Sequence, residues 1–485
     1  MHQKRSDFKA LGSTRSLFTS ATRARNRNKH PFALERPRNL ETARADREVK
    51  QWLRSPWQRD CRELAESGYD AIVIHSGSAK KRSEFDDQYW PLRPTPHFQH
   101  WLPLSAADCA LIATQGQKPK LIWTQEHSFW ETSAPPTHDF WQSGFEISVV
   151  SGRDEVKAHL PTGRVAFIGE DRACAAAWGF ADTAVNPAEL MKALDGLRTL
   201  KTRYEELCLE EANRLAAFGH DALAHAFHSG DASELELHLL FLRATQQDDP
   251  ETPYKNIVAL GPNAATLHHV SYQRTQPTAS AAQSLLVDAG ASFLGYSSDI
   301  TRTHVKGTGA TASAFAGLVA GVEHLQQRLC AEIRVGTKYE ALHDRSHQYV
   351  AQTLREVGVV KVSEDEAISS GVTRAFFPHG LGHSLGLQVH DVGCALLKPR
   401  ADNPFLRNTS VIAARQCFTI EPGIYFINSL LEPVRQGANG GLVDWNLVSQ
   451  LAALGGVRIE DDIVVGETPE GTRNLTRAFL SSNTV

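Results

Sequence analysis

The chain has 485 residues, of which 41% are hydrophobic and 22% charged, and its formal net charge is −4 at pH 7. This length exceeds what one hydrophobic core usually spans, so two domains are expected. The small net charge gives no whole-chain attraction to nucleic acid or acidic membranes, and no apolar run approaches the roughly 18 residues of a membrane span. Seven scattered cysteines without a CxxC pair favour reduced thiols and a cytoplasmic location.

Residues 1–44 differ in composition from the rest of the chain. They are rich in Arg, Lys, Ser, Thr and Asn, and their only acidic residues are Asp7, Glu35 and Glu41. We interpret them first as a basic, disordered extension or the product of a start codon assigned too far upstream. The composition is also that of a transit peptide, which would place the protein in the mitochondrion or another organelle.

Residues 45–196 are predicted to form a smaller α/β domain. Helical segments between residues 41 and 67, broken near Pro56, precede a series of short apolar runs that are typical of buried strands. These strands are expected at Tyr69–His75, Cys109–Thr114, Lys120–Trp123 and Arg164–Ile168. Residues 85–103 contain many aromatic residues and prolines, so we expect an ordered loop there.

Residues 197–485 form the predicted second domain, and it begins with two capped helices. A long amphipathic helix is expected over residues 202–227, because Thr202 and Glu205 have the spacing of a capping box. Ser233 and Glu236 repeat this spacing at the start of a helix over 232–244. A strand at 254–260 and helices at 310–332 and 339–357 are expected further along. Periodicity alone indicates only an α+β class.

Asp288 and Asp299 lie at the two ends of a glycine-containing segment between two β-prone runs. This pattern predicts a hairpin. If its turn centres on Phe293 and Leu294, the two aspartates face each other with Cβ atoms about 4.5–5.5 Å apart. Two like charges that close are unfavourable unless a cation lies between them or one is protonated. The plainer alternative is a pair of ordinary turn aspartates.

Three later segments add polar residues of the kinds that bind metals. The sequence FFPHGLGHSLGLQVHDVG carries His379, His383 and His390 among glycines. Glu421 lies in the apolar segment FTIEPGIYF, where an unpaired carboxylate would be costly. In GGVRIEDDIVV, period-2 alternation places Arg458 and Glu460 on one face of a strand.

Two Asp, two Glu and one His form an oxygen-rich ligand set that suits manganese or a similar divalent ion. From the residues alone, we interpret the set as a two-metal hydrolytic site. The spacing D-x10-D, together with HGxGHxxGLxVHD, TIEPGIY and GGxRIED, resembles the metallopeptidases of the pita-bread fold. The resemblance is strongest to bacterial-type prolidases (Xaa-Pro dipeptidases), a group that includes organophosphorus acid anhydrolases, and it extends from about residue 45 to the C-terminus.

The resemblance implies a pita-bread catalytic domain, a curved antiparallel sheet flanked by helices. It implies two divalent metal ions bound by Asp288, Asp299, His383, Glu421 and Glu460, with Asp299 and Glu460 bridging them. A shared hydroxide would attack the carbonyl before proline. Glu421 would carry the water proton to the prolyl nitrogen, and His268, preferred over His269, would stabilise the oxyanion.

The resemblance also implies substrate-binding residues and partners. His379, assigned a catalytic role, and His390 fit substrate binding, while Arg458 either holds the proline carboxylate through its bidentate fork or supports a metal ligand. Further lining residues are expected at Tyr254 and Tyr339. Trp130 and either Asp86 or Asp87 are expected to help close the pocket of a neighbouring subunit. The expected partner is a small Xaa-Pro peptide, with no nucleic acid or membrane, and the expected assembly is a homodimer.

Other activities stay open at this stage. An aminopeptidase P-like enzyme would cleave longer peptides with proline second. A phosphotriester hydrolase could use the same hydroxide, either as its main activity or as a side activity. A non-catalytic pita-bread binding module, or a metal-free hydrolase, would be expected to have lost metal ligands, and all five are present here.

Overall fold

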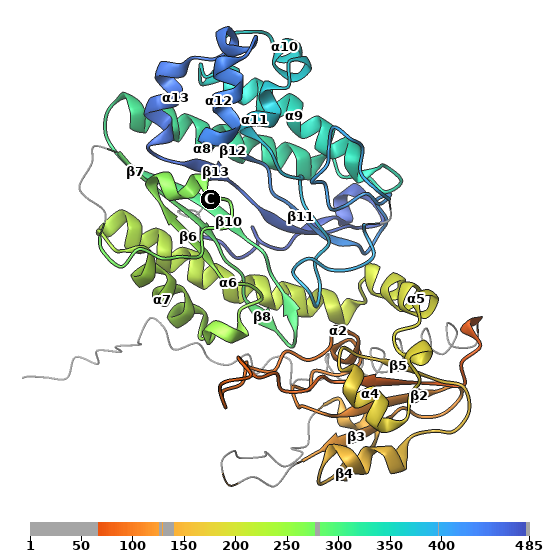
Figure 1. The fold of residues 1–485 in the computed structure, drawn as a ribbon. Helices are drawn as coiled ribbons and strands as arrows, with labels where there is room; N and C mark the ends of the chain where they lie inside the picture. Colours follow the sequence, from red (N-terminus) through yellow and green to blue (C-terminus); the bar gives the residue numbers. More distant parts are fainter. Residues whose placement is uncertain (1–65, 126–128, 130–139, 277–281, 396, 482–485) are drawn as a thin grey trace, which may run out of the picture. The chain divides into compact units, whose positions relative to one another are not determined.

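The computed structural model describes residues 66–125, 129, 140–276, 282–395 and 397–481 (Figure 1). A five-stranded sheet with the order β4-β3-β2-β1-β5 forms the core of the N-terminal region. Its strands are β1 (Ala71–His75), β2 (Ala110–Thr114), β3 (Lys120–Thr124), β4 (Glu146–Val150) and β5 (Val165–Ile168). The pairs β3–β4 and β1–β5 are parallel and the other two antiparallel.

This sheet is buried on both faces. Ile72 and Ile74 contribute to one hydrophobic cluster, whereas Val73 between them contributes to another with Phe167 and Trp178. The helices of this region are α2 (Pro96–Gln99), α3 (Arg153–Val156), α4 (Arg172–Trp178) and α5 (Ala188–Thr199). The four predicted strands are confirmed to within one or two residues. Strand β4 was not predicted, because it is a largely exposed edge strand without an apolar run.

The second region opens with the two predicted capped helices, α6 (Arg203–Ser229) and α7 (Glu234–Thr245). In both capping boxes the side chain of the N-cap residue accepts the N3 amide, and the N3 glutamate accepts the N-cap amide. The helices that follow are α8 (Ala310–Ala331), α9 (Tyr339–Glu356), α10 (Glu364–Ser369), α11 (Val372–Phe376), α12 (Asn428–Gln436) and α13 (Trp445–Ala452).

The strands of this region form small antiparallel sheets. They are β6 (Ile257–Leu260), β7 (Ala282–Asp288), β8 (Ser292–Phe293), β9 (Tyr296–Ser297), β10 (Thr301–Gly307), β11 (Cys417–Ile420), β12 (Gly423–Tyr425), β13 (Gly456–Arg458), β14 (Asp461–Val464) and β15 (Arg473–Asn474). The orders are β10-β7-β6, β11-β14-β15, β12-β13 and β8-β9. Isolated bridges join Thr301 to Glu460 and Ser384 to Phe418, so ligand-bearing segments from different sheets lie together.

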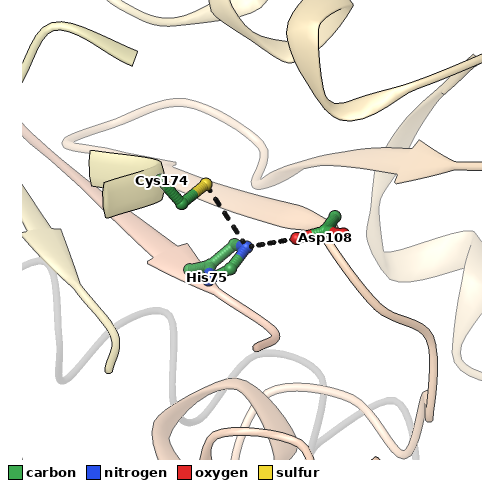
Figure 2. A group of neighbouring side chains, drawn as sticks. All are labelled: His75, Asp108 and Cys174. Carbon is green, nitrogen blue, oxygen red and sulfur yellow. Dashed lines mark hydrogen bonds and ion pairs between the residues drawn. The ribbon is translucent and has the colours of Figure 1, made fainter. Parts of the chain in front are cut away.

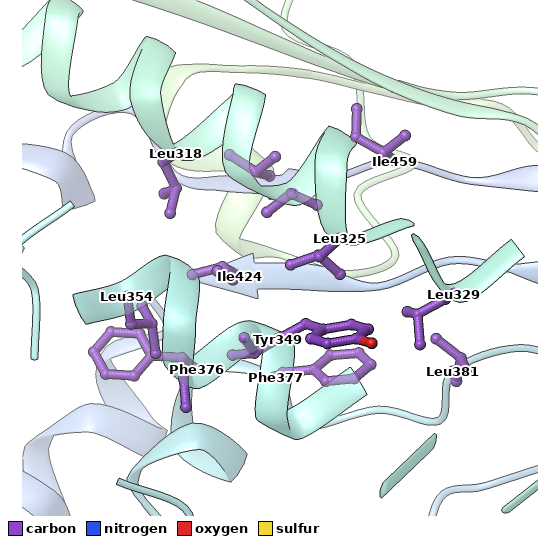
Figure 3. Close-up of a cluster of buried hydrophobic side chains, with 14 of the residues drawn as sticks. Leu318, Leu325, Leu329, Tyr349, Leu354, Phe376, Phe377, Leu381, Ile424 and Ile459 are labelled. Carbon is purple, nitrogen blue, oxygen red and sulfur yellow. The ribbon is translucent and has the colours of Figure 1, made fainter. Parts of the chain in front are cut away.

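Helices α8, α9 and α11 pack against strands β12 and β13 in the largest hydrophobic cluster (Figure 3). Leu325 and Leu354 come from two of the helices, and Ile424 from β12. Each fully buried side chain of this size contributes about 1.5–3 kcal/mol. This apolar layer supports the strands whose other face carries the polar residues described below.

The hairpin carrying the two aspartates differs from the prediction by one residue. Ser292 pairs with Ser297 and Phe293 with Tyr296, so the turn is Leu294-Gly295. Both turn residues have positive φ, 50° and 90°, as a type I′ turn requires. Asp288 therefore pairs with Thr301 rather than with Asp299. The predicted direct opposition of the aspartates is wrong, because Gly295 supplies the left-handed position and draws the turn toward it.

Within the described residues, no helix combines the length and apolarity needed to cross a membrane.

Candidate active site

A cavity of about 860 Å³ opens between the ends of β7, β11 and β13 and the histidine-containing loop after α11. This volume falls in the range of about 300–1,000 Å³ that is typical of small-molecule sites. Part of its lining is apolar and exposed, and consists of Val270, Phe405 and Leu430. The five predicted metal ligands all line it as well: Asp288, Asp299, His383, Glu421 and Glu460.

Although the aspartates are not directly opposed, one tyrosine connects them. The Tyr254 hydroxyl lies 2.7 Å from Asp288 Oδ1 and 2.5 Å from Asp299 Oδ1. A hydroxyl has one proton to donate, so it satisfies one carboxylate at a time. Burial and the two carboxylates raise the pKa of Tyr254 well above its usual value, which keeps the hydroxyl protonated. The hydroxyl therefore brings the two carboxylates together without neutralising the charge of either.

His383 lies between two of the acids. Its Nε2 is 3.3 Å from Asp299 Oδ2 and 3.5 Å from Glu421 Oε1. Its Nδ1–H donates to the Ser384 carbonyl oxygen at 3.0 Å, so Nε2 is the ring nitrogen that faces the acids. Glu460 completes this group, because a donor atom from each of Asp299, His383 and Glu460 lies within 4.8 Å of the others.

The electrostatics of this group fit a cation. Burial is the main cause that raises the pKa of Asp299, Glu460 and Glu421, and repulsion among the carboxylates raises them further. The pKa of Glu421 rises to about 7. Carboxylate oxygens and one imidazole nitrogen are suitable ligands for a divalent metal, and a cation at this position would remove the repulsion.

Arg458 is hydrogen-bonded among the residues predicted as metal ligands rather than projecting freely into the cavity. Its Nη2 donates to Asp288 Oδ2 at 2.6 Å, and its Nε donates to Thr301 Oγ1 at 3.1 Å. Thr301 Oγ1 in turn donates to Glu460 Oε2 at 2.6 Å. One guanidinium therefore orients two acids from different strands. Of the two roles considered for Arg458, this geometry favours the supporting one.

His379 belongs to the same hydrogen-bonded chain. Its Nδ1–H donates to the Gly380 carbonyl at 2.8 Å, so Nε2 accepts from the Tyr425 hydroxyl at 2.8 Å. Arg458 Nη1 donates to that hydroxyl at 3.0 Å. Burial and the Arg458 charge lower the pKa of His379 to about 3, so its ring is neutral.

Of the other predicted histidines, two line the cavity and one does not. Exposed His268 lines the cavity, whereas Nε2 of His269 is 2.8 Å from Glu234 Oε2, outside the lining. His390 also lines the cavity, and its ring stands edge-on to His383 with centroids 4.4 Å apart. Burial and the neighbouring His383 lower the pKa of His390 to about 3. The placement of His268 and His390 agrees with roles toward substrate, which remain predictions.

Three predicted lining residues have other outcomes. Tyr339 is fully buried under the site, donates to the Thr419 carbonyl at 2.8 Å and does not line the cavity, so its predicted lining position is wrong. It packs edge-on against Phe418 because it faces the apolar layer. Trp130 lies outside the described residues. Asp86 lies in an exposed loop and not in this cavity, and its predicted contact with another subunit stays a prediction.

Sequence reasoning missed one residue that lines the cavity and two buried residues behind it. Thr301 and Tyr425 connect Arg458 to its neighbours, and Tyr425 was visible as the last residue of TIEPGIY. Arg407 lines the cavity and, among the described residues, has no hydrogen bond or ion pair. The sequence offers little signal for it, because the surrounding FLRN matches no motif that indicates a binding residue.

Outside the cavity, a buried ionic triad holds the loop that carries His390. Asp391 accepts from Arg198 Nη2 at 2.6 Å and from Lys201 Nζ at 2.7 Å. Arg198 also donates to Gln388 at 3.0 Å. The two cations hold the pKa of Asp391 below its usual value despite its burial. The triad connects the end of α5 to the histidine loop.

Comparisons with known proteins agree with this geometry. Residues 207–467 match the model of metallopeptidase family M24, and residues 49–195 match the model of the Xaa-Pro dipeptidase N-terminal domain. A Xaa-Pro dipeptidase of Pseudoalteromonas atlantica is 40% identical over 424 residues, which cover 85% of this chain and 94% of that protein. One from Aeromonas hydrophila is 41% identical over 426 residues, with shares of 85% and 94%.

Proline aminopeptidase P II from Yersinia pestis superposes with a TM-score of 0.68 at 21% identity, covering 90% of this chain and 97% of that structure. At that identity the similarity shows the fold, and it confirms the predicted pita-bread domain preceded by a smaller α/β domain. The predicted resemblance to bacterial prolidases is confirmed by the sequence relatives. The chain belongs to metallopeptidase family M24.

Proposed function

We propose that this protein is a metal-dependent Xaa-Pro dipeptidase, which hydrolyses the bond before a C-terminal proline. The observation that carries the proposal is one cavity with two contrasting features. Its floor holds four carboxylates and an imidazole, and its wall holds one arginine, Arg407, without a partner among the described residues. The sequence relatives that cover most of the chain are Xaa-Pro dipeptidases.

The metal ligands we propose are Asp288, Asp299, His383, Glu421 and Glu460, holding two divalent ions. When bound, such ions supply a hydroxide nucleophile near neutral pH and stabilise developing negative charge. The oxygen-rich donor set favours manganese over softer metals. Arg458 and Thr301 keep the carboxylates oriented, which is the role of outer partners in metal sites.

We assign the proton transfer to Glu421. Glu421 is a carboxylate that lines the cavity beside the other proposed ligands, so it can accept a proton from water and return it. The proton taken from the attacking water would pass to the prolyl nitrogen, which has no hydrogen of its own in an imide bond. To His268, which is exposed and lines the cavity, we assign stabilisation of the oxygen of the scissile carbonyl.

Arg407 is our candidate for binding the substrate's carboxylate. Arg458 already donates to Asp288, Tyr425 and Thr301, so its fork is occupied. Lys255, a second cation of the lining, is paired with Asp249 at 2.8 Å. Arg407 is therefore the lining cation able to take a carboxylate without breaking a described ion pair. A clamp on the carboxylate of proline would favour dipeptides over longer chains.

The test compares hydrolysis of Ala-Pro and Ala-Pro-Ala by chelator-stripped protein, with and without added manganese. We expect activity on the dipeptide alone, restored by the metal, and none in Asp299→Asn. Cleavage of the tripeptide would replace the proposal with an aminopeptidase P-like activity. Absence of cleavage of both substrates by metal-loaded protein would contradict it.

A second measurement tests the clamp. Arg407→Met should raise KM for Ala-Pro at least tenfold with little change in kcat, since it removes binding and not chemistry. Lys255→Met is the matched control, because Lys255 lines the same cavity and is already neutralised. With Ala-proline amide, which lacks the carboxylate, wild type and Arg407→Met should behave alike. Equal KM values of Arg407→Met and wild type for Ala-Pro would assign the clamp elsewhere.

The finer predictions remain proposals with tests of their own. Manganese as the preferred ion is checked by comparing reactivation with manganese, zinc and cobalt. The homodimer is checked by light scattering. A side activity on phosphotriesters follows from the shared nucleophile, and hydrolysis of paraoxon that is lost in Asp299→Asn would support it.

A further inference from the structure

A second group of metal-ligating side chains lies in the N-terminal region, apart from the active-site cavity. His75 ends strand β1, Asp108 precedes β2, and Cys174 lies in the first turn of α4 (Figure 2). A donor atom of each lies within 4.8 Å of the others. His75 and Cys174 are almost completely buried, and the Asp108 side chain is 18% exposed. None of the three lines the active-site cavity.

The His75–Asp108 distance in this cluster is too long for a good hydrogen bond, whereas the His75–Cys174 distance is ordinary for a contact with sulfur. His75 Nε2 lies 3.4 Å from Asp108 Oδ1 and 3.7 Å from Cys174 Sγ. N–H···O bonds are usually about 2.7–3.2 Å long, and one ring N–H cannot point at both acceptors. His75 Nδ1 is buried without a partner among the described residues, so Nε2 is the ring atom aimed at the cluster.

The same distances fit the edges of a tetrahedron around zinc. Zn–N and Zn–O bonds of about 2.0–2.2 Å and a Zn–S bond of about 2.3 Å give, at tetrahedral angles, N···O edges of about 3.4 Å and N···S edges of about 3.6 Å. The observed separations of 3.4 Å and 3.7 Å match both edges.

A separate observation is that two carboxylates lie together beside His75, and that the Arg153 charge acts on both without forming an ion pair. The Ser78 hydroxyl lies 2.5 Å from Asp108 Oδ1 and 2.7 Å from Asp171 Oδ2, yet it can donate only one proton. Among the described residues, neither aspartate forms an ion pair with a lysine or arginine. Two carboxylates therefore share one hydroxyl proton beside a buried imidazole.

We propose that His75, Asp108 and Cys174 bind one zinc ion, with water at the fourth position. The thiol would lose its proton to solvent as the Zn–S bond forms, and no oxidation is involved. Ser78 and Asp171, which neighbour the cluster, also line a cavity of about 1,060 Å³. The ion would tie β1, the segment before β2 and α4 together, and so stabilise the sheet.

The probe is cobalt, added to chelator-stripped full-length protein. A thiolate ligand gives cobalt a sulfur-to-metal charge-transfer band in the near ultraviolet, and carboxylate and imidazole ligands do not. No cysteine lines the active-site cavity, so ions bound there are silent in this band. We expect the band to saturate at one thiolate-bound cobalt per chain and to disappear when zinc is added.

The variants locate the site. Asp299→Asn should keep the full band, which separates this proposal from the active site. Cys174→Ser should lose it, and Cys109→Ser should retain it. Cys109 is the matched control, because it is a buried thiol next to Asp108 in the chain, its Sγ–H donates to the Ala107 carbonyl, and it does not belong to the cluster. His75→Gln should lose the band as well, which provides a second variant if Cys174→Ser does not fold.

Two results would overturn the proposal. One is absence of the band in wild-type protein at saturating cobalt, and the other is its persistence in folded Cys174→Ser. Thermal unfolding gives a readout without cobalt: zinc should raise the midpoint of Asp299→Asn and leave that of Asp299→Asn combined with Cys174→Ser unchanged. Equal responses of the two proteins would count against the site.

Discussion

His220 in α6 allows a quantitative test of how burial of a histidine makes stability depend on pH. Its side chain is 1% exposed, and its Nε2 donates to the carbonyl of Ala289, the residue after Asp288, at 2.9 Å. The ring packs edge-on against Phe241. Burial is the main cause that lowers the pKa of His220 to about 4, and the nearby Arg302 charge adds to it. The substitution we propose is His220→Gln, which keeps an N–H donor but cannot titrate.

The sign follows from proton uptake. The folded pKa of about 4 is below the ordinary value of 6.5, so the unfolded chain binds the proton first as pH falls. The contribution of His220 to stability is complete above pH 6.5 and is lost progressively down to about pH 4. The total loss is about 3 kcal/mol, at 1.36 kcal/mol for each pKa unit, and about 2 kcal/mol of it has occurred at pH 5.

The assay is urea unfolding followed by circular dichroism, on chelator-stripped wild type and His220→Gln at pH 7, 6 and 5. The difference between the two proteins cancels the contributions of other buried histidines. We expect His220→Gln to gain about 2 kcal/mol relative to wild type between pH 7 and pH 5. Parallel pH dependences in the two proteins would show that His220 does not remain neutral in the folded state, and would refute the reasoning.

Three further predictions concern the active site and its support. Glu421→Gln should keep the fold but lose kcat by about 10²- to 10⁴-fold, the usual value of a proton-transfer group, and near wild-type turnover of metal-loaded variant would exclude this role. Arg458→Lys should weaken metal binding about 10- to 100-fold by loosening Asp288, with KM unchanged at saturating metal. A raised KM would instead give Arg458 the carboxylate-binding role. Lys201→Met should lower the free energy of unfolding by about 3–5 kcal/mol, because it breaks a buried ion pair with Asp391. A thermal midpoint equal to wild type would show that Arg198 alone satisfies Asp391.

The parts of the fold that were predictable from sequence are those with strong local signals. The capping boxes at Thr202 and Ser233 fix where α6 and α7 begin, and the structure places both as predicted. Apolar runs identified four strands of the N-terminal sheet. The turn of the aspartate hairpin was misplaced by one residue, which shifts the partner of Asp288 from Asp299 to Thr301, because the turn depends on the positive φ of Leu294 and Gly295 and not on hydrophobic pattern.

In the candidate site, too, some features could be predicted from sequence and others could not. All five predicted metal ligands line one cavity, because their motifs combine charged residues with apolar strands in which an isolated charge would be costly. The roles of Arg458 and Tyr339 could not be read from sequence, since they depend on contacts between distant segments. Arg458 is 170 residues from the Asp288 carboxylate to which it donates, and Tyr339 reaches the Thr419 carbonyl 80 residues away.

The ionic triad of Arg198, Lys201 and Asp391 has a consequence for altering this protein's substrate preference. His390 lines the cavity, and the adjacent Asp391 is fixed by two cations at the junction between α5 and α6. Directed evolution toward a new substrate should therefore select substitutions along α5 that never contact that substrate, because any shift of this helix is passed to the cavity wall. Libraries restricted to cavity residues would leave this means of reshaping the pocket unused.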